Sequence, residues 1–243
     1  MQLAPAFLLH QRAWRDSSRI VEFLARDHGR VVLFAKGVRR PRSALAAALQ
    51  PFAPLLLSWS GSGDGGTLTG VELACGPMAL PAASVMSGFY LNELLLRLLA
   101  REDPHPEVYA AYALALAGLR AAGGTARALR LFEKRLLDAL GLGLDYGHLA
   151  SDGTPLAADT YYHVEAARGV LGVAERPDPG AAYRGAELLS LAAEELADPQ
   201  SLAAARRLLR AALAGPLDGH ELASRSVARA LQAKTTGRGD PPR

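Results

Sequence analysis

The sequence predicts an α+β protein in which a five-stranded barrel precedes a mainly helical domain. The chain is 50% hydrophobic and 21% charged, which is too apolar for a disordered chain and too charged for a membrane protein. Residues 1–80 consist of short runs of Val, Leu, Phe and Ile between turn signals, whereas Leu and Ala recur at helical spacing from residue 84 on. These patterns predict strands first and helices second. We therefore divide the chain into domains at residues 1–80 and 81–243.

The first domain contains five predicted strands and one short helix. The strands cover about residues 5–10, 18–25, 30–36, 52–59 and 66–74. Residues 27–30 form a tight turn, residues 60–66 form a glycine-rich hairpin tip, and Ser43 caps a helix over 44–49. This order is that of an OB-fold barrel, which binds oligonucleotides on its strand 2–3 face and its 1–2 and 4–5 loops. A five-stranded SH3-like barrel fits the run lengths almost as well.

Helix signals divide the second domain into segments. Helices are expected over about 85–99 and 106–122, then from a Thr125 cap to Gly141, from Asp198-Pro199 to Gly215, and over 219–232. Residues 142–172 fit no helix, so we expect a small β insertion there. The tail, about residues 234–243, is expected to be disordered.

Positive charge is concentrated near the beginning of the chain. The whole sequence has a net charge of +3, but before residue 44 nine basic residues face only Asp16, Glu22 and Asp27, which gives +6. A basic segment of this kind indicates a polyanion as the partner.

The third predicted strand runs into a basic loop that is the first candidate for binding nucleic acid. Lys36, Arg39, Arg40 and Arg42 can fan out over one rim of the barrel, where they would neutralise phosphates. Gly37 lets the backbone approach closely. The alternative is a solvated basic loop without a ligand.

The predicted 1–2 loop, residues 11–17, is the second candidate. It carries Arg12, Trp14 and Arg15, so that an indole lies between two guanidinium groups. Bases stack on aromatic rings and arginine adds phosphate or cation–π contacts, which suits single-stranded nucleic acid. The alternative is that Trp14 packs over the barrel mouth as part of the core.

The sequence offers little for catalysis or metal binding. The six histidines lack metal-type spacing, and Asp145, His148, Asp152 and His163 are spread over a turn-rich segment. Cys75 is the single cysteine, which excludes an internal disulfide. We expect no catalytic residue, metal or cofactor. The first residues lack the basic n-region of a signal peptide, and no apolar run reaches the ~18 residues of a membrane span, so we expect a cytoplasmic protein without a membrane partner.

Five strings in order resemble the bacterial RecO family of recombination mediators, over about residues 5–231. They are Ala35-Lys36-Gly37-Val38-Arg39-Arg40 with Ser43, Leu49-Gln50-Pro51-Phe52, Tyr90-Leu91-Asn92-Glu93-Leu94, Leu129-Arg130-Leu131-Phe132-Glu133 with Leu136-Leu137 and Leu140-Gly141, and Ser224-Arg225. The resemblance implies an OB domain and a helical domain. It further implies binding to single- and double-stranded DNA, annealing of complementary strands, and work with RecR and SSB to load RecA, in the cytoplasm at the nucleoid.

The resemblance also bears on metal and partner sites. Some family members carry a four-cysteine zinc cluster after the stretch matched by Leu140-Gly141, where this chain has no cysteine, so it resembles the zinc-free proteobacterial branch. Relatives bind the acidic, Phe-ended tail of SSB beside an arginine matched by Arg130. Arg127 lies on the neighbouring turn of the same helix face, and both are expected at the tail site. The alternative is that they are exposed surface charges.

Together these features predict a non-enzymatic DNA repair and recombination mediator of the RecF pathway type. Annealing requires a surface that screens phosphate repulsion between two strands while their bases stay free to pair. Two other functions stay open on the residues alone. One is an OB-type RNA-binding or ribosome-associated protein. The other is a metal-dependent hydrolase built on His148, His163 and nearby carboxylates.

Overall fold

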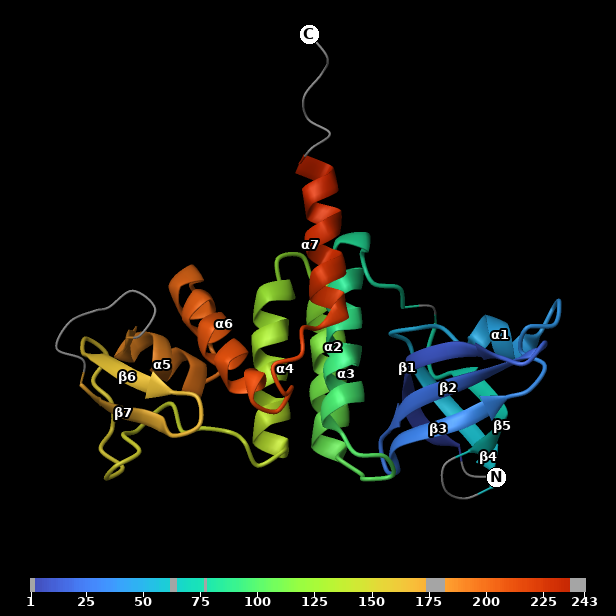
Figure 1. Cartoon of the computed structure of the whole chain (residues 1–243), viewed down its shortest axis with the longest axis horizontal. Helices are drawn as coiled ribbons and strands as arrows, with labels where there is room; N and C mark the ends of the chain where they lie inside the picture. The colour runs from blue at the N-terminus through green and yellow to red at the C-terminus, as the bar shows by residue number, and fades with distance from the viewer. Residues whose placement is uncertain (1–2, 62–64, 77, 174–181, 237–243) are drawn as a thin grey trace, which may run out of the picture. The chain divides into compact units, whose positions relative to one another are not determined.

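The computed structural model describes residues 3–61, 65–76, 78–173 and 182–236 (Figure 1). They belong to two compact units, one of Met1–Arg120 with Glu221–Arg243 and one of Ala121–His220. Because the first helices group with the barrel, these units do not follow the domain boundary at residue 80, which stays a prediction. No helix in the described part of the chain has the combined length and apolar character that a membrane span requires.

The first unit begins with a closed barrel in the order β1-β2-β3-β5-β4. Its elements are β1 (Ala4–Trp14), β2 (Ser18–Ala25), β3 (Gly29–Ala35), α1 (Ala44–Ala48), β4 (Pro54–Ser60) and β5 (Gly66–Leu73). β1 pairs with β2 and β4 in antiparallel fashion, and a parallel pairing of β3 with β5 closes the barrel. Ser43 caps α1 by accepting a hydrogen bond from the Ala46 backbone N–H. The predicted OB-fold barrel is confirmed.

Residues of β3 alternate between the barrel core and its outer surface. Val31, Leu33 and Ala35 are buried in the core, whereas the residues between them are half-exposed. The predicted third strand is confirmed, and its side chains alternate because successive side chains of a strand point to opposite faces. The outer row of β3 therefore ends in Phe34, and Lys36 follows directly after the strand, beside the candidate site.

The strand β1 is longer than its sequence pattern predicts. It stays paired with β2 up to the Trp14–Ser18 pair, so that only residues 15–17 form the turn between the two strands. Arg12 and Trp14 are thus strand residues and not loop residues as predicted. The physical reason is that the ladder with β2 satisfies the backbone of residues 10–14, although none of these residues is buried in the core.

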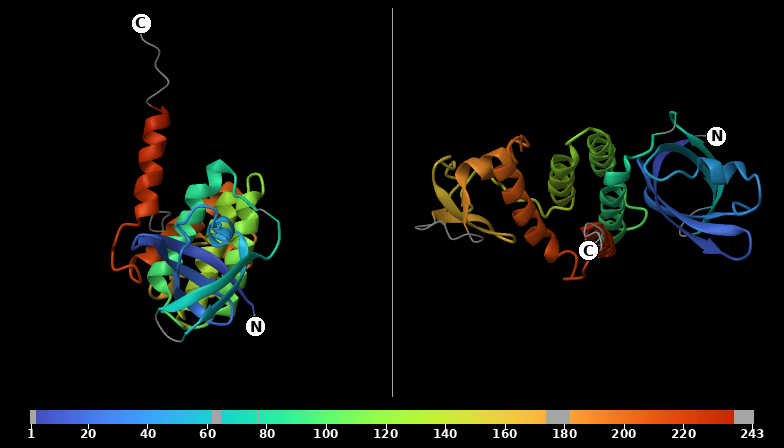
Figure 2. Two further views of the ribbon diagram at one scale, coloured as in Figure 1. Left: turned by 90° about the vertical axis from the view of Figure 1, so that its right-hand side faces the viewer. Right: turned by 90° about the horizontal axis from the view of Figure 1, so that it is seen from above.

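Three helices complete the first unit: α2 (Val85–Leu98), preceded by the short η1 (Ala82–Ser84), α3 (Pro106–Arg120) and α7 (Ala223–Thr236). Figure 2 shows them from two further sides. α7 continues past residue 234, where the tail was expected to be disordered; the tail's other residues, 237–243, lie outside the described residues.

Asn92 ties α2 to the barrel. Its amide donates to the carbonyl oxygen of Leu9 at 2.8 Å and accepts from the Tyr112 hydroxyl at 2.5 Å. Leu9 lies at a bulge in β1 between Leu8 and His10, which leaves its carbonyl available. On the next residue, the Glu93 carboxylate accepts hydrogen bonds from the first residues of α7, at 2.9 Å from the Ala223 N–H and 2.7 Å from the Ser224 hydroxyl. The string from Tyr90 to Leu94 therefore holds this unit together.

The described residues of the second unit form three helices and a small sheet. They are α4 (Thr125–Ala139), α5 (Gly185–Ala192) and α6 (Pro199–Ala214), with β6 (Tyr161–Glu165), β7 (Gly169–Val173) and β8 (Ala182–Arg184) in the order β7-β6-β8. The β insertion is confirmed, but its strands begin later than residue 142 and include β8, beyond residue 172. Asp198 caps α6 by accepting from the Ser201 N–H at 2.8 Å, as predicted. The sequence pattern did not indicate α5.

Candidate nucleic-acid interface

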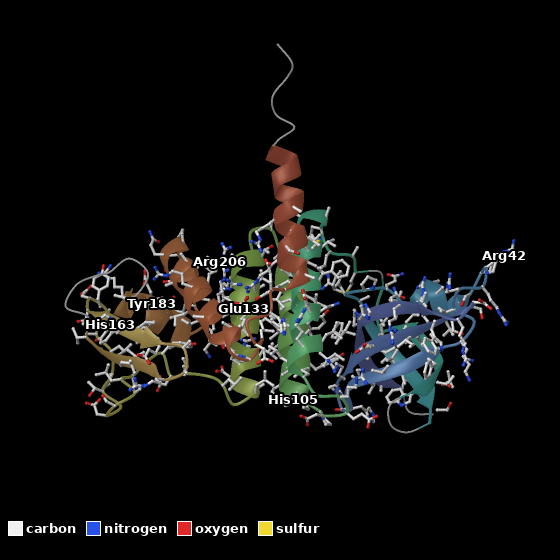
Figure 3. The ribbon with its side chains drawn as sticks, viewed as in Figure 1. Arg42, His105, Glu133, His163, Tyr183 and Arg206 are labelled. Atoms are coloured by element: carbon white, nitrogen blue, oxygen red, sulfur yellow. The ribbon has the colours of Figure 1, made fainter. Side chains whose placement is uncertain are left out.

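The loop after β3 carries the exposed basic residues predicted from the sequence. Val38 is only 1% exposed and anchors this loop in the barrel core. Gly37 has a positive φ of 68° and accepts from the Arg40 N–H at 3.1 Å, which turns the chain back on itself. Lys36, Arg39 and Arg40 all lie exposed, as does Arg42 at the next turn (Figure 3). The buried Val38 therefore fixes the loop while its basic side chains face the solvent.

The two predicted segments lie beside each other. The Arg39 backbone N–H donates to the carbonyl oxygen of Ser17 at 3.0 Å, and the Arg39 guanidinium donates to the carbonyl oxygen of Arg15 at 3.2 Å. Residues 15–17 and 36–42, far apart in the sequence, thus form one edge of the barrel. We call Arg15, Lys36, Arg39, Arg40 and Arg42 the basic rim.

Two aromatic rings lie next to the basic rim. Trp14 is 39% exposed and lies outside the barrel core. Its ring centroid is 6.1 Å from that of Phe34, and the Arg15 guanidinium carbon is 6.0 Å from the Trp14 ring. A Cβ added to Gly65 would come within 3.1 Å of the Phe34 ring, so the β4–β5 hairpin also approaches this pair. Phe34 is a candidate residue that the sequence pattern missed; the alternation of β3 could have revealed it.

Arg12 lies exposed on β1, two residues before Trp14 and therefore on the same outer face. Neighbouring Arg19 is held differently, because its guanidinium donates to the Gln11 side chain at 2.8 Å. Within the described part of the chain, no ion pair involves Arg12 or the basic rim. Their charges are thus available to phosphates, and the two rings offer surfaces on which bases can stack.

The segment suggested for a metal hydrolase does not assemble into a metal site. His148 lies 2.9 Å from the Asp145 carboxylate, and the Gly147 N–H and His148 together lower the pKa of Asp145. His163 lies exposed on β6 (Figure 3). The described residues contain no group of three or more His, Cys, Asp or Glu side chains placed to hold a metal ion.

The arginines predicted for the partner site both lie on α4 but differ in their surroundings. Arg127 is exposed, and its guanidinium donates to the backbone carbonyls of Glu195 at 2.7 Å and Glu194 at 2.6 Å. Arg130 is only 8% exposed, and its guanidinium donates to the Glu133 carboxylate at 2.5 Å. The Arg130 Nε is buried without a hydrogen-bond partner in the described part of the chain. Arg130 is therefore not an exposed surface charge.

Known proteins resemble this chain along nearly its whole length. A family model described as Recombination protein O N terminal matches residues 1–76, and one described as Recombination protein O C terminal matches residues 83–226. A protein of Nitrosococcus oceani named DNA repair protein RecO is 44% identical over 231 residues, which cover 95% of this chain and 94% of the relative. A protein of the same name from Dechloromonas aromatica is 41% identical over 231 residues, covering 94% of this chain and 95% of the relative.

Proposed function

Because the chain belongs to the RecO family of DNA repair proteins, we propose that it is a repair and recombination mediator that binds single- and double-stranded DNA and anneals complementary strands. With RecR it would help to load RecA on single strands coated by SSB, in the cytoplasm at the nucleoid. The observation that carries the DNA-binding part is the hydrogen bonding of Arg39 to the Arg15–Ser17 turn, beside the Trp14–Phe34 pair.

The proposed mechanism uses binding alone. Guanidinium groups of the basic rim contact phosphates and release counterions, which lowers the repulsion between two strands. Contacts to phosphate carry no sequence information and leave the base edges free to pair. Trp14 and Phe34 stack on unpaired bases, which favours single strands before annealing. We propose no catalytic residue, metal or cofactor for this activity.

The test replaces Arg39, Arg40 and Arg42 by alanine. Affinity for labelled oligonucleotides of different sequence should fall by a similar factor, and the slope of log K against log salt should flatten by roughly 0.7–0.9 for each phosphate that is no longer neutralised. A matched pair controls for net charge: Arg40→Ala should weaken binding, whereas Arg26→Ala should not, because Arg26 is paired with Asp27 at 3.0 Å elsewhere on the barrel. If the triple variant keeps the parental affinity and the parental slope of log K against log salt, the basic rim is a solvated loop that does not bind nucleic acid.

For the SSB tail, we propose that the terminal carboxylate pairs with Arg130, with Arg127 beside it. The near-complete burial of Arg130 supports this placement, because a charge-assisted bond is strongest where water is excluded. In the variant Arg130→Ala, the loss of that bond would lower the affinity for the tail by about 2–5 kcal/mol. This variant should still anneal bare complementary strands, whereas it should fail to anneal strands that are coated by SSB.

Arg130→Ala alone would confuse two effects, because it also removes the guanidinium that pairs with the buried Glu133. The variant Arg130→Met/Glu133→Leu replaces the pair by apolar groups of similar size, which is often neutral for stability. Arg130→Lys keeps the charge without the planar fork and should bind an acidic, Phe-ended tail peptide with intermediate affinity. If the apolar double variant binds this peptide as well as the parent protein does, the tail site lies elsewhere.

A further inference from the structure

Beyond its first turn, the outward face of α6 consists of arginines and alanines. Arg206, Arg207 and Arg210 are exposed, and the remaining exposed residues of that face include Ala203, Ala211 and Ala214 (Figure 3, where Arg206 is labelled). The sequence of α6 contains no Asp or Glu. Solvent-exposed helix faces normally carry both signs of charge, with acidic residues one turn from basic ones. A face with positive charge alone therefore needs a reason outside the helix.

The arginines of α6 differ from every other described basic side chain of the second unit. Those others donate to acidic side chains or backbone carbonyls within the unit, and they are Arg127, Arg130, Lys134, Arg135, Arg168 and Arg184. In the described part of the chain, no side-chain hydrogen bond or ion pair involves Arg206, Arg207 or Arg210. Among the described residues of the second unit, this face thus has no hydrogen-bond or ion-pair partner.

The positions of these arginines do not favour folding. Arg206 and Arg210 are separated by one helical turn, where like charges destabilise a helix. Alanine has the highest helix propensity and would serve better at exposed positions. The Arg207 guanidinium carbon lies 4.6 Å from the ring of Tyr183 on β8, an arrangement that orients the guanidinium through a cation–π contact. Arg207 therefore has a packing contact within the unit, whereas no such contact explains Arg206 and Arg210 among the described residues.

We propose that this α6 face binds the phosphate backbone of a second nucleic-acid strand, while the basic rim of the barrel holds the first. This inference rests on the proposed annealing function and adds a second site to it. Short alanine side chains between the arginines let a backbone approach closely, and the face offers no bulky apolar side chain that an aromatic-ended acidic peptide would need. Positive charge without such a pocket suits a polyanion bound without sequence preference.

The experiment uses the full chain and the double variant Arg206→Ala/Arg210→Ala, which keeps the cation–π pair of Arg207 and Tyr183. Titration with a labelled single strand of about 12 nucleotides, within the range of one OB fold, should give two binding sites in the parent protein and one in the variant. Annealing of two such complementary strands should slow by roughly tenfold, because two phosphates of the second strand are no longer neutralised. Circular dichroism should show an unchanged helix content, since alanine favours the helix.

The matched control is Arg168→Ala/Arg184→Ala, which removes two arginines of the same unit that are already paired with Glu165 and Asp159. It should keep both sites and the annealing rate. The inference is overturned if the α6 variant keeps two sites and the parental annealing rate, or if it loses only the binding of an acidic peptide. If the parent protein binds no strand, the proposed function itself is refuted. If annealing is lost in the basic-rim variant but not in the α6 variant, the proposed function holds and the α6 site is refuted.

Discussion

The basic rim and helix α4 both carry several arginines, but in opposite surroundings. Rim arginines are exposed, and none takes part in an ion pair within the described residues. On α4, Arg130 pairs with the buried Glu133, and Arg135 pairs with Glu194 at 2.5 Å. The difference teaches that an arginine with an internal partner contributes to stability, whereas an exposed arginine without an ion pair contributes little.

The largest stability effect that this comparison predicts is that of Arg130→Ala. The change removes the guanidinium from a pair in which Glu133 is only 1% exposed, and breaking a buried pair typically costs about 3–5 kcal/mol. Hydrogen exchange of the α4 and α6 amides in the full chain would measure it. The double variant Arg130→Met/Glu133→Leu should recover most of the loss. A single variant as stable as the parent protein would mean that the pair contributes no stability.

A smaller effect is expected for Arg127→Ala. Its guanidinium donates to two backbone carbonyls just after α5, but the residue is exposed, so we expect a loss of about 1 kcal/mol. Arg127→Lys should recover only part of it, because lysine lacks the fork that reaches both carbonyls. Thermal unfolding of the full chain gives the comparison, and equal stability of the three proteins would contradict it.

The Arg135–Glu194 pair predicts a pH dependence. The hydrogen bond that Arg135 donates to the Glu194 carboxylate holds the pKa of Glu194 below its usual value of 4.5. A lowered pKa in the folded state stabilises the protein above about pH 4.5, and this contribution is lost as the pH falls through the lower folded pKa. A half-exposed pair is worth about 0.2–1 kcal/mol. Glu194→Gln should therefore be less stable than the parent protein near neutral pH, and its free energy of unfolding should fall less as the pH is lowered. Glu195→Gln should show the same pH dependence of stability as the parent protein.

The smallest effect is predicted for the basic rim. Replacing Arg39, Arg40 and Arg42 by alanine should change the free energy of unfolding by less than ~0.5 kcal/mol, because exposed charges away from caps and pairs rarely matter more. Arg39 also donates a hydrogen bond to the Arg15 carbonyl, so its replacement should account for most of the loss in the free energy of unfolding. Denaturant unfolding would check the value, and a loss as large as that of Arg130→Ala would remove the distinction between the two regions.

Local patterns predicted much of this protein. The five short apolar runs, the Ser43 cap and the Asp198-Pro199 helix start were all located from residue types and spacing, because caps and strand alternation depend on near neighbours. Such signals also placed Lys36, Arg39, Arg40 and Arg42 in one loop. They failed at the exposed end of β1, where pairing with β2 and not an apolar pattern keeps the residues up to Trp14 in the strand, and they missed α5.

What the sequence by itself determined is therefore the barrel, the helical character of the rest, the small β insertion and the positive charge of the first segment. Tertiary structure alone decided how each arginine is used. Arg15 and Arg39 lie together because β1, β2 and β3 are paired, and Arg130 is buried against Glu133. The arginines of α6 face the solvent without a hydrogen-bond or ion-pair partner among the described residues of their unit. The physical reason is that charge is a property of a residue, whereas burial and hydrogen-bond partners are set by segments far away in the chain.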